Sequence, residues 1–468
     1  FSPAPLVPRM TSDVPTTQTA IATGMRPGFR SPVMMLTAMT ASFFINARLA
    51  LVFLVAAPVL GILLFLIISH VRPLYTLMQG AIDRVNRIIQ ENLTAIRVVK
   101  SCVRGDYEIQ KFSQVNDSLR QTSERAFRLA ALNAPAMQFV MYTTILTILW
   151  FGGSFSAVGG VQVGELTGFL SYVLQVLNSL MMLSNVFMTV TRAMASWNRI
   201  REVMDEEIEI TEERARDIQV AEGDIRFDHV YFKYHPDAEE YVLSDISFHI
   251  KPGQTVGIIG QTGSAKSTLV QLIPRLYEAT EGTVYIDGHP VAEYPLKGLR
   301  DSIAMVLQKN TLFTGTVKDN LRWGKEDATD EEIRRVCQIA CVDEFIDRLE
   351  NGLDTMLGQG GVNVSGGQKQ RLCIARALPK NPKVLILNDS TSAVDTATEA
   401  KIREGMAKSL PGTTKIIIAQ RITSVLHADQ ILVLDDGKLN DVGTHESLLA
   451  SNPIYQDIYY SQQEGANL

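Results

Sequence analysis

A run of small residues between Gly260 and Thr268 carries the clearest chemistry in the chain. The run reads Gly-Gln-Thr-Gly-Ser-Ala-Lys-Ser-Thr, follows the β-branched apolar stretch 255–259 and precedes the apolar stretch 269–273. We therefore expect a strand, a glycine loop and a helix. In this setting the backbone N–H groups turn inward and the helix N-terminus adds positive potential, so a triphosphate is the natural occupant. Lys266 would reach the β- and γ-phosphates, and Ser267 would offer its hydroxyl to Mg²⁺.

One position departs from the G-x-x-x-x-G-K-[ST] pattern of such loops. Ala265 stands where the second glycine belongs, and we expect its methyl group to be tolerated if the residue keeps φ below zero. A chance turn is the alternative interpretation, but the strand, the Lys-Ser-Thr triplet and the helix together favour phosphate binding. The predicted nucleotide contacts in the loop are Gly260, Gly263, Ser264, Ala265, Lys266, Ser267 and Thr268.

Two further stretches fit this loop. The apolar run 384–387 ends in Asn388 and Asp389, where phosphate-binding-loop proteins place an acid near Mg²⁺ and a neighbour that polarises the attacking water. Val364-Ser-Gly-Gly-Gln368 enters a helix, either as an ordinary cap by Ser365 or as a second phosphate-binding helix start. Sequence distance alone leaves both interpretations of this turn open.

Short apolar runs alternate with amphipathic segments from Ile225 onward. Such runs are typical of strands that are covered on both faces, so we predict an α/β domain with a parallel core sheet. The predicted strands are 256–259, 303–307, 384–387, 415–419 and 431–434.

The first 200 residues have a different character, because charged residues are missing from long stretches. A membrane span needs about 20 mostly apolar residues, so the uncharged runs 49–69, 129–164 and 166–191 predict three spans, and the shorter run 31–47 predicts a marginal fourth. Buried helices of a large soluble domain are the less favoured alternative, since all these runs cluster in one half.

The stretch between the second and third runs indicates the orientation. Residues 71–128 hold ten Lys or Arg against six acids, so the positive-inside rule places this stretch in the cytoplasm. We expect two long helices that run out of the membrane and break near Gly105, with 104–112 furthest from the bilayer. The Asn46-Ala-Arg48 link predicts a tight turn between the first two spans.

The composition sets the remaining bounds. We predict an α-helical transmembrane domain over 1–204, an acidic linker over 205–224 and an α/β P-loop nucleotide-binding domain over 225–468.

The four cysteines have no ligand neighbours and are interpreted as thiols of a reducing cytosol. The chain is mildly acidic, with a net charge of −6, and we expect no nucleic-acid partner. The opening residues have no initiator Met, and we expect the chain to start inside a longer gene product.

Taken together, these motifs resemble the ATP-binding cassette (ABC) exporters over nearly the whole chain. The loop 260–268 looks like Walker A, 385–389 like Walker B and 364–368 like the signature motif. The remaining matches are the Q-loop glutamine Gln308, the D-loop Ser392–Asp395, the adenine-stacking Tyr234 and the switch position, Gln420.

The resemblance implies a dimer, with each Mg²⁺·ATP held between one chain's Walker motifs and the other chain's signature. It implies nucleotide contacts at Tyr234, Gln308, Asn388 and the signature residues, and metal contacts at Ser267 and Gln308. It also implies that about two N-terminal helices of a six-helix set are absent, and that 104–112 is the second coupling helix. We expect a multi-pass protein of the bacterial plasma membrane, in contact with membrane lipids, that exports a hydrophobic small molecule, lipid or peptide. The implied signature contacts are Ser365, Gly366, Gly367 and Gln368.

Four departures from the family pattern fall in one ATP site. They are Ala265, Asn388, Asp389 in place of the usual Glu, and Gln420 in place of the usual His. All four weaken hydrolysis more than binding, whereas the signature is intact. We therefore expect the degenerate-site subunit of a heterodimeric exporter, with hydrolysis mainly at the partner's composite site. The alternatives are a slow homodimeric exporter and an ATP-gated membrane regulator that transports nothing.

Overall fold

The computed structural model of this protein describes residues 6, 9–157, 162–390 and 393–466. The chain divides into two compact units, residues 1–207 and 208–468. Each unit has its own hydrophobic core.

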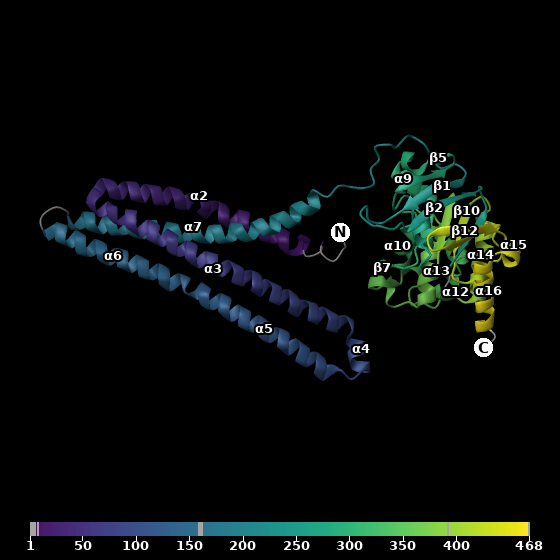
Figure 1. Cartoon of the computed structure of the whole chain (residues 1–468), viewed down its shortest axis with the longest axis horizontal. Helices are drawn as coiled ribbons and strands as arrows, with labels where there is room; N and C mark the ends of the chain where they lie inside the picture. The colour runs from purple at the N-terminus through teal and green to yellow at the C-terminus, as the bar shows by residue number, and fades with distance from the viewer. Residues whose placement is uncertain (1–5, 7–8, 158–161, 391–392, 467–468) are drawn as a thin grey trace. The chain divides into compact units, whose positions relative to one another are not determined.

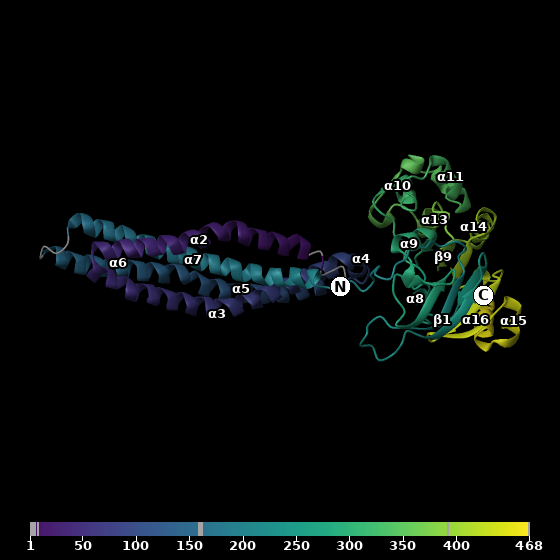
Figure 2. The same cartoon turned by 90° about the horizontal axis from the view of Figure 1, so that it is seen from above.

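The first unit is a bundle of long helices. Figures 1 and 2 show α2, α3, the α5–α6 pair and α7 running side by side, with α4 where α3 turns back into α5. The bundle core is formed by apolar side chains such as Leu60, Ile148 and Phe169. The helices are a short π-helix Arg9–Asp13, α2 Val14–Ile45, α3 Ala47–Thr94, α4 Ile96–Ser101, α5 Gly105–Ala131, α6 Asn133–Ala157 and α7 Val163–Met204.

Three helical stretches of the described chain are long and apolar enough to cross a membrane. They are Pro58–Thr94, Gly105–Ser154 and Gly164–Phe187. The marginal run 31–47 lies mostly on α2, which is not among them, so three of the four predicted spans have a counterpart. The predicted tight turn is confirmed, because the side chain of Asn46 caps α3 by accepting from the N–H groups of Arg48 and Leu49.

The break between the two long helices expected over residues 71–128 lies slightly earlier than predicted. The chain leaves α3 at Ala95, forms α4, and turns through residues 102–104, where Val103 has a φ of 53°. Gly105 begins α5 instead of breaking a helix, since Asp106 and Glu108 in the first turn favour a helix N-terminus. Residues 105–112 are therefore helical, and the break predicted near Gly105 lies at residues 102–104.

Ionic and close apolar contacts hold α2 against α7. The carboxylate of Asp13, at the start of α2, accepts from Ser196 Oγ at 2.9 Å and from Arg199 Nε at 2.8 Å. Further along, a Cβ on Gly28 would lie 3.7 Å from Val186 Cγ1, so the two helices pack closely there. The side chain of Asp13 is 8% exposed, and its hydrogen bonds compensate the cost of burying the charge.

The second unit contains a parallel sheet and a smaller antiparallel sheet. The six-stranded sheet has the order β12-β11-β3-β10-β9-β6, in which only the edge strand β12 is antiparallel. The four-stranded sheet has the order β2-β1-β4-β5, and β7 pairs with β8. The strands are β1 Ile225–Phe232, β2 Leu243–Ile250, β3 Thr255–Ile259, β4 Glu281–Ile286, β5 His289–Pro290, β6 Ile303–Val306, β7 Gly315–Thr316, β8 Met356–Leu357, β9 Val384–Asn388, β10 Thr414–Ile418, β11 Gln430–Asp435 and β12 Lys438–Gly443.

The helices of this unit lie around the parallel sheet. In Figure 2, α10 and α11 lie at one end of the unit and α15 and α16 at the other. The helices are α8 Lys266–Gln271, α9 Leu296–Ser302, α10 Val317–Arg322, α11 Asp330–Ile339, α12 Asp343–Ile346, α13 Gly366–Ala377, α14 Thr396–Ser409, α15 His445–Ser451 and α16 Pro453–Ala466. All five predicted strands are confirmed to within one residue, because each is an apolar run buried between helices.

Much of the predicted linker belongs to the second unit. Arg275 donates to the carbonyl of Thr211 at 2.8 Å, and Glu212 accepts from the N–H of Leu296 at 2.6 Å. Asp287 accepts from four successive N–H groups, those of residues 221–224, at 2.7–3.1 Å. The chain is thus fixed to this unit from Thr211 onward.

The Asp13 contacts predict a stability change in the helical unit. Asp13→Ala leaves the guanidinium of Arg199 without its carboxylate, and because that guanidinium is half-exposed we expect a loss of about 1–3 kcal/mol. Thermal unfolding of the full chain in detergent should show a lower midpoint. Glu124→Ala, which breaks the exposed Arg120–Glu124 pair, is the control and should change the midpoint little. Equal shifts for both variants would contradict this assignment.

Candidate functional site

Four motifs meet at the carboxyl ends of four neighbouring strands. In the order β3, β10, β9 and β6, these ends are followed by Gly260, Gln420, Asp389 and Gln308. All four strands run parallel, so their ends open onto the same edge of the sheet, where α/β proteins bind ligands. The fold therefore brings together residues that are up to 160 positions apart in sequence (420 − 260).

The loop after β3 depends on glycine at its first position. Gly260 has a φ of 158°, and a Cβ there would lie 2.1 Å from the carbonyl oxygen of Leu434 on β11. Gly263 has a φ of 93°, which favours glycine, although a Cβ there would meet open space. The neighbouring strand thus forces the loop to start with a residue that has no side chain.

Ala265, the residue that departs from the phosphate-loop sequence pattern, adopts a left-handed conformation. Its φ is 65° and its ψ is 18°, immediately before α8 begins. The condition under which we expected its methyl group to be tolerated, a φ below zero, is therefore not met. The loop retains the backbone path that a glycine would follow, and the alanine bears a conformational cost of about 1–2 kcal/mol.

Lys266 lies folded into the loop that precedes it. Its Nζ donates to the carbonyls of Gly260 and Gln261, at 2.8 and 2.7 Å, and to Ser264 Oγ at 3.2 Å. Burial lowers the pKa of Lys266, and the nearby carboxylate of Asp389 opposes this by favouring the charged form. The ammonium group is the positive centre of the site.

The two hydroxyl residues after Lys266 connect the loop to other motifs. Ser267 Oγ donates to Asn388 Oδ1 at 3.1 Å, which joins the loop to the end of β9. Thr268 Oγ1 and the hydroxyl of Tyr234 lie 2.8 Å apart. The Tyr234 ring, 43% exposed, is therefore held beside the first turn of α8, where it is accessible to an aromatic ligand.

Asp389 lies at the centre of a group of side-chain amides. Its Oδ2 accepts from Gln420 Nε2 at 2.8 Å, and Gln308 also hydrogen-bonds to the carboxylate. Burial raises the pKa of Asp389, while these two amides and the charge of Lys266 act in the opposite direction. The backbone of Asp389 is left-handed, with a φ of 50°.

The signature turn is a helix cap in this structure. Ser365 and Gln368 form a capping box at the start of α13, with the N–H of Ser365 2.8 Å from Gln368 Oε1 and the N–H of Gln368 3.3 Å from Ser365 Oγ. A Cβ on Gly367 would lie 2.9 Å from the carbonyl oxygen of Ala393, whereas one on Gly366 would make ordinary contact. The close approach at Gly367 brings α13 against the loop that follows Asp389.

The structure adds a residue that the sequence did not single out. Gln370, buried on α13, accepts from the N–H of Ala393 at 2.9 Å and approaches the carbonyl of Asp389 at 3.5 Å. Its position two residues after Gln368 was the only signal. Of the predicted D-loop Ser392–Asp395, Ser392 lies outside the described part of the chain, and Asp395 caps α14 by accepting from the N–H of Thr398 at 2.9 Å.

The four cysteines contribute no candidate site. All are free, and Cys337, Cys341 and Cys373 are buried, with burial raising the pKa of Cys337 to about 12. Within the described ranges no three His, Cys, Asp or Glu side chains are grouped as metal ligands. The interpretation of the cysteines as ordinary thiols therefore remains a prediction.

The fold and this site define a class of protein. A chain that joins a phosphate-binding loop on a parallel sheet to a bundle of membrane-length helices is an ATP-binding membrane protein. The family model for the ABC transporter transmembrane region matches residues 4–180, and the family model described as ABC transporter matches residues 243–392. The chain belongs to the ABC transporter family, as an exporter-type half-transporter that binds ATP.

Relatives and a solved structure agree with this assignment. The chain is 42% identical to an uncharacterized ABC transporter ATP-binding protein, YfiB of Bacillus subtilis, over 99% of this chain and 80% of that one. It is 34% identical to a probable multidrug resistance ABC transporter of the same organism, over 98% and 78%. It is 32% identical to an ATP-dependent lipid A-core flippase of Desulfotalea psychrophila, over 98% and 80%. A bacterial Atm1-family ABC exporter with ATP bound superposes with a TM-score of 0.83 at 26% identity, over 98% of this chain and 82% of that one.

The left-handed Ala265 predicts a stabilising substitution. Ala265→Gly removes the conformational cost and should raise the stability of the nucleotide-binding unit by about 1 kcal/mol. Ala279→Gly is the matched control, because Ala279 packs on the same core cluster and is not among the residues with positive φ. Thermal unfolding of both variants as full chains measures the difference. If Ala265→Gly destabilises the chain as much as Ala279→Gly does, the left-handed backbone of Ala265 does not carry the expected conformational cost.

Proposed function

We propose that this chain is the degenerate-site subunit of a heterodimeric ABC exporter for amphipathic substrates. The observation that carries the proposal is the contrast between its two functional surfaces. The Walker site combines a left-handed alanine with amide side chains at Asn388 and Gln420, whereas the start of α13 has an intact Ser-Gly-Gly-Gln turn. One chain thus holds a weakened half of one site and a complete half of another.

The residues around Ser267 suit ATP and Mg²⁺ binding. Lys266 would exchange its bonds to the loop for the β- and γ-phosphates, and the exposed ring of Tyr234 would stack on adenine. The hydroxyl of Ser267 and the amide oxygens of Asn388 and Gln308 form an all-oxygen donor set, which Mg²⁺ prefers. Bound there, Mg²⁺ would neutralise phosphate charge. With a neutral amide at position 388, the site would hold the ion less tightly.

Asp389 and Gln420 are poorly suited to activate water. The carboxylate of Asp389 is one methylene shorter than that of a glutamate, and it already accepts from Gln420. A general base must lie within about 3 Å of the water that it deprotonates, which the shorter side chain makes harder, and such catalysis contributes about 10²–10⁴-fold. Gln420 can donate to a γ-phosphate but carries no positive charge. The site would therefore bind Mg²⁺·ATP more readily than cleave it.

The second functional surface would serve the partner. Ser365, Gly366, Gly367 and Gln368 form the N-terminus of the 12-residue helix α13, where the unsatisfied N–H groups and the helix dipole favour a phosphate. The capping box that Ser365 forms with Gln368 keeps this turn in place. In the dimer that ABC exporters form, this turn would complete the ATP site on the second half-transporter, and most hydrolysis would occur there.

Two other functions make different predictions. A slow homodimeric exporter would have two identical weak sites, so that any ATPase activity would need Asp389. An ATP-gated regulator would bind ATP and move its helices without transport. Co-purification of the native complex, followed by ATPase and vesicle transport assays, distinguishes the three functions.

The contrast between the two surfaces gives a test by mutation. In the assembled native complex, Ser365→Ala should reduce the ATPase rate by about 10²-fold or more, whereas Asp389→Ala should reduce it far less, because general-base loss of about 10²–10⁴-fold applies only to a site that hydrolyses. An unchanged thermal unfolding midpoint in both variants is the control for folding. If Asp389→Ala abolished activity and Ser365→Ala did not, this chain's own site would be the hydrolytic one.

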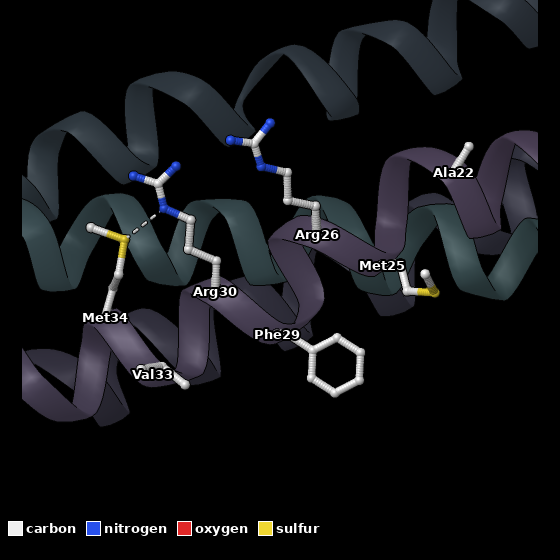
Figure 3. A pocket seen from close by; sticks show the side chains of 7 residues that line it. All are labelled: Ala22, Met25, Arg26, Phe29, Arg30, Val33 and Met34. Atoms are coloured by element: carbon white, nitrogen blue, oxygen red, sulfur yellow. Dashed lines mark hydrogen bonds between the residues drawn. The ribbon is translucent and has the colours of Figure 1, made fainter.

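The substrate side of the proposal begins with a hollow on α2. It has a volume of about 540 Å³ and is lined by one face of this helix, including Met25, Phe29 and Val33 together with Arg26 and Arg30. Figure 3 shows both guanidinium groups extending to the same side of the helix. Arg30 Nε approaches Met34 Sδ at 3.1 Å, and α2 contains no Asp or Glu.

The depth of these arginines supports an anionic amphiphile. Gly28, between them, packs against Val186, which lies near the end of the membrane-length stretch Gly164–Phe187 of α7. Charged side chains at the end of a span lie near the edge of the bilayer, where guanidinium groups pair strongly with phosphate or carboxylate. Apolar side chains on the same helix would contact the substrate's hydrocarbon part. Relatives named as multidrug and lipid transporters support a substrate of this class.

Neutralising the two arginines tests this substrate class. Arg26→Gln with Arg30→Gln should raise the concentration of an anionic amphiphile that half-stimulates ATPase by about tenfold, since a charged hydrogen bond contributes about 1.5–3 kcal/mol. A neutral amphiphile of equal chain length should be affected little. Arg48→Gln, in the first turn of α3 and beyond the end of α2 that is far from Asp13, is the matched control. Equal loss for both amphiphiles would indicate a role in helix packing instead of recognition.

A further inference from the structure

The side chain of Gln462, on the C-terminal helix α16, contacts the backbone of the switch position. Its Nε2 donates to the carbonyl of Gln420 at 2.7 Å, and its Oε1 accepts from the N–H of Ile422 at 2.9 Å. One primary amide therefore holds the peptide groups on both sides of Arg421, in the way that a neighbouring strand would. This backbone is extended, with φ −97° and ψ 129° at Arg421.

These two bonds continue directly into the nucleotide site. Gln420, whose carbonyl is held by Gln462, directs its own side chain to Asp389 Oδ2 at 2.8 Å. Side chains that follow a strand end have freedom to turn, and fixing the peptide groups before and after Arg421 reduces that freedom. The hydrogen bonds thus form a continuous path from α16 to Asp389.

The helix that carries Gln462 is anchored independently of it. Tyr455, fully buried on α16, has its hydroxyl 2.7 Å from Nδ1 of His445, and its N–H donates to Asn452 Oδ1 at 2.9 Å. Ile458 and Tyr459 also pack on the main core cluster. Loss of the Gln462 amide would therefore release the peptide groups around Arg421 without detaching α16.

We propose that Gln462 is a positioning residue, which holds the backbone at 420–422 so that Gln420 faces the γ-phosphate and Asp389. The inference rests on the proposed role of Gln420 as the residue that senses the γ-phosphate. It adds the C-terminal helix to the nucleotide site and makes that helix a determinant of ATP over ADP binding. The residue acts through Gln420 and does not touch the nucleotide.

The test uses the full chain in lipid nanodiscs and compares a non-hydrolysable ATP analogue, AMP-PNP, with ADP. Gln462→Met keeps the length of the side chain and removes both hydrogen bonds. It should raise the Kd for AMP-PNP about fivefold, the effect of one net hydrogen bond, and change the Kd for ADP less than about twofold. Gln463→Ala is the matched control, because Gln463 is the next residue of α16 and bonds to the hydroxyl of Tyr459 at 2.7 Å. It should leave both Kd values unchanged.

A double-variant cycle separates positioning from general stabilisation. If Gln462 acts through Gln420, then Gln420→Ala with Gln462→Met binds AMP-PNP as Gln420→Ala alone does. Gln462→Glu keeps the acceptor for Ile422 and should lie between wild type and Gln462→Met. Additive losses in the double variant, or equal loss of AMP-PNP and ADP, would overturn the inference.

The outcome is independent of where hydrolysis occurs. AMP-PNP is not cleaved, so the test remains valid wherever hydrolysis occurs. A site in this chain that hydrolyses ATP, or a homodimer, would refute the proposed function without affecting this test. A Gln420→Ala variant that binds AMP-PNP as wild type does would remove the switch role itself and overturn the inference with it. A Gln420→Ala effect without a Gln462→Met effect would overturn only the inference.

Discussion

The parallel register of β3, β10, β9 and β6 is the constraint on which the site depends. Neighbouring strands of a sheet lie about 4.8 Å apart, so residues that follow the ends of adjacent strands are fixed within reach of one another. Gly260, Gln420 and Asp389 owe their proximity to this spacing. The constraint extends to the other side of β3, where the carbonyl of Leu434 leaves no room for a side chain on Gly260. The phosphate loop is thus shaped by strand packing as much as by its own sequence.

At this edge of the sheet, neutral amide side chains occupy two positions where ABC exporters usually have charged or ionisable groups. Asn388 and Gln420 keep the hydrogen-bonding capacity of an acid and an imidazole but not their charge, and both make short contacts, to Ser267 and to Asp389. A buried carboxylate that has amide partners is stabilised in place, because its desolvation is compensated by hydrogen bonds. The site is well ordered by these contacts and weak in the charges that polarise water.

The sequence predicted the parts of the fold that have short-range signals. The five core strands follow from apolar runs covered on both faces, and the Asn46 turn follows from a capping residue between two helices. The antiparallel sheet was not predicted, since β1 and β2 are exposed on one face and alternate in burial. The helix break was misplaced because Gly105, a weak helix former, is followed by acids that favour a helix N-terminus. The mixed character of α2, with two arginines and two internal prolines, accounts for the uncertain fourth span.

The candidate site was predictable in its residue types and not in its backbone or its supporting contacts. The motif residues are identified by their order along the chain. The φ of Ala265 is set by the path between β3 and α8, which the residue type alone would have opposed. Gln370 and Gln462 have no motif of their own, since each acts through a long-range contact to a backbone group. Such contacts require the tertiary structure.

The contacts of Arg275 with Thr211 and of Glu212 with Leu296 determine the length of the tether between the two units. A free linker over the whole of 205–224 could extend to about 70 Å, at about 3.4 Å per residue. With Thr211 already fixed, only residues 205–210 remain between the end of α7 and the nucleotide-binding unit, and six residues extend to about 20 Å. A tether this short transmits tension, so a displacement of the nucleotide-binding unit beyond that reach must pull on α7 itself.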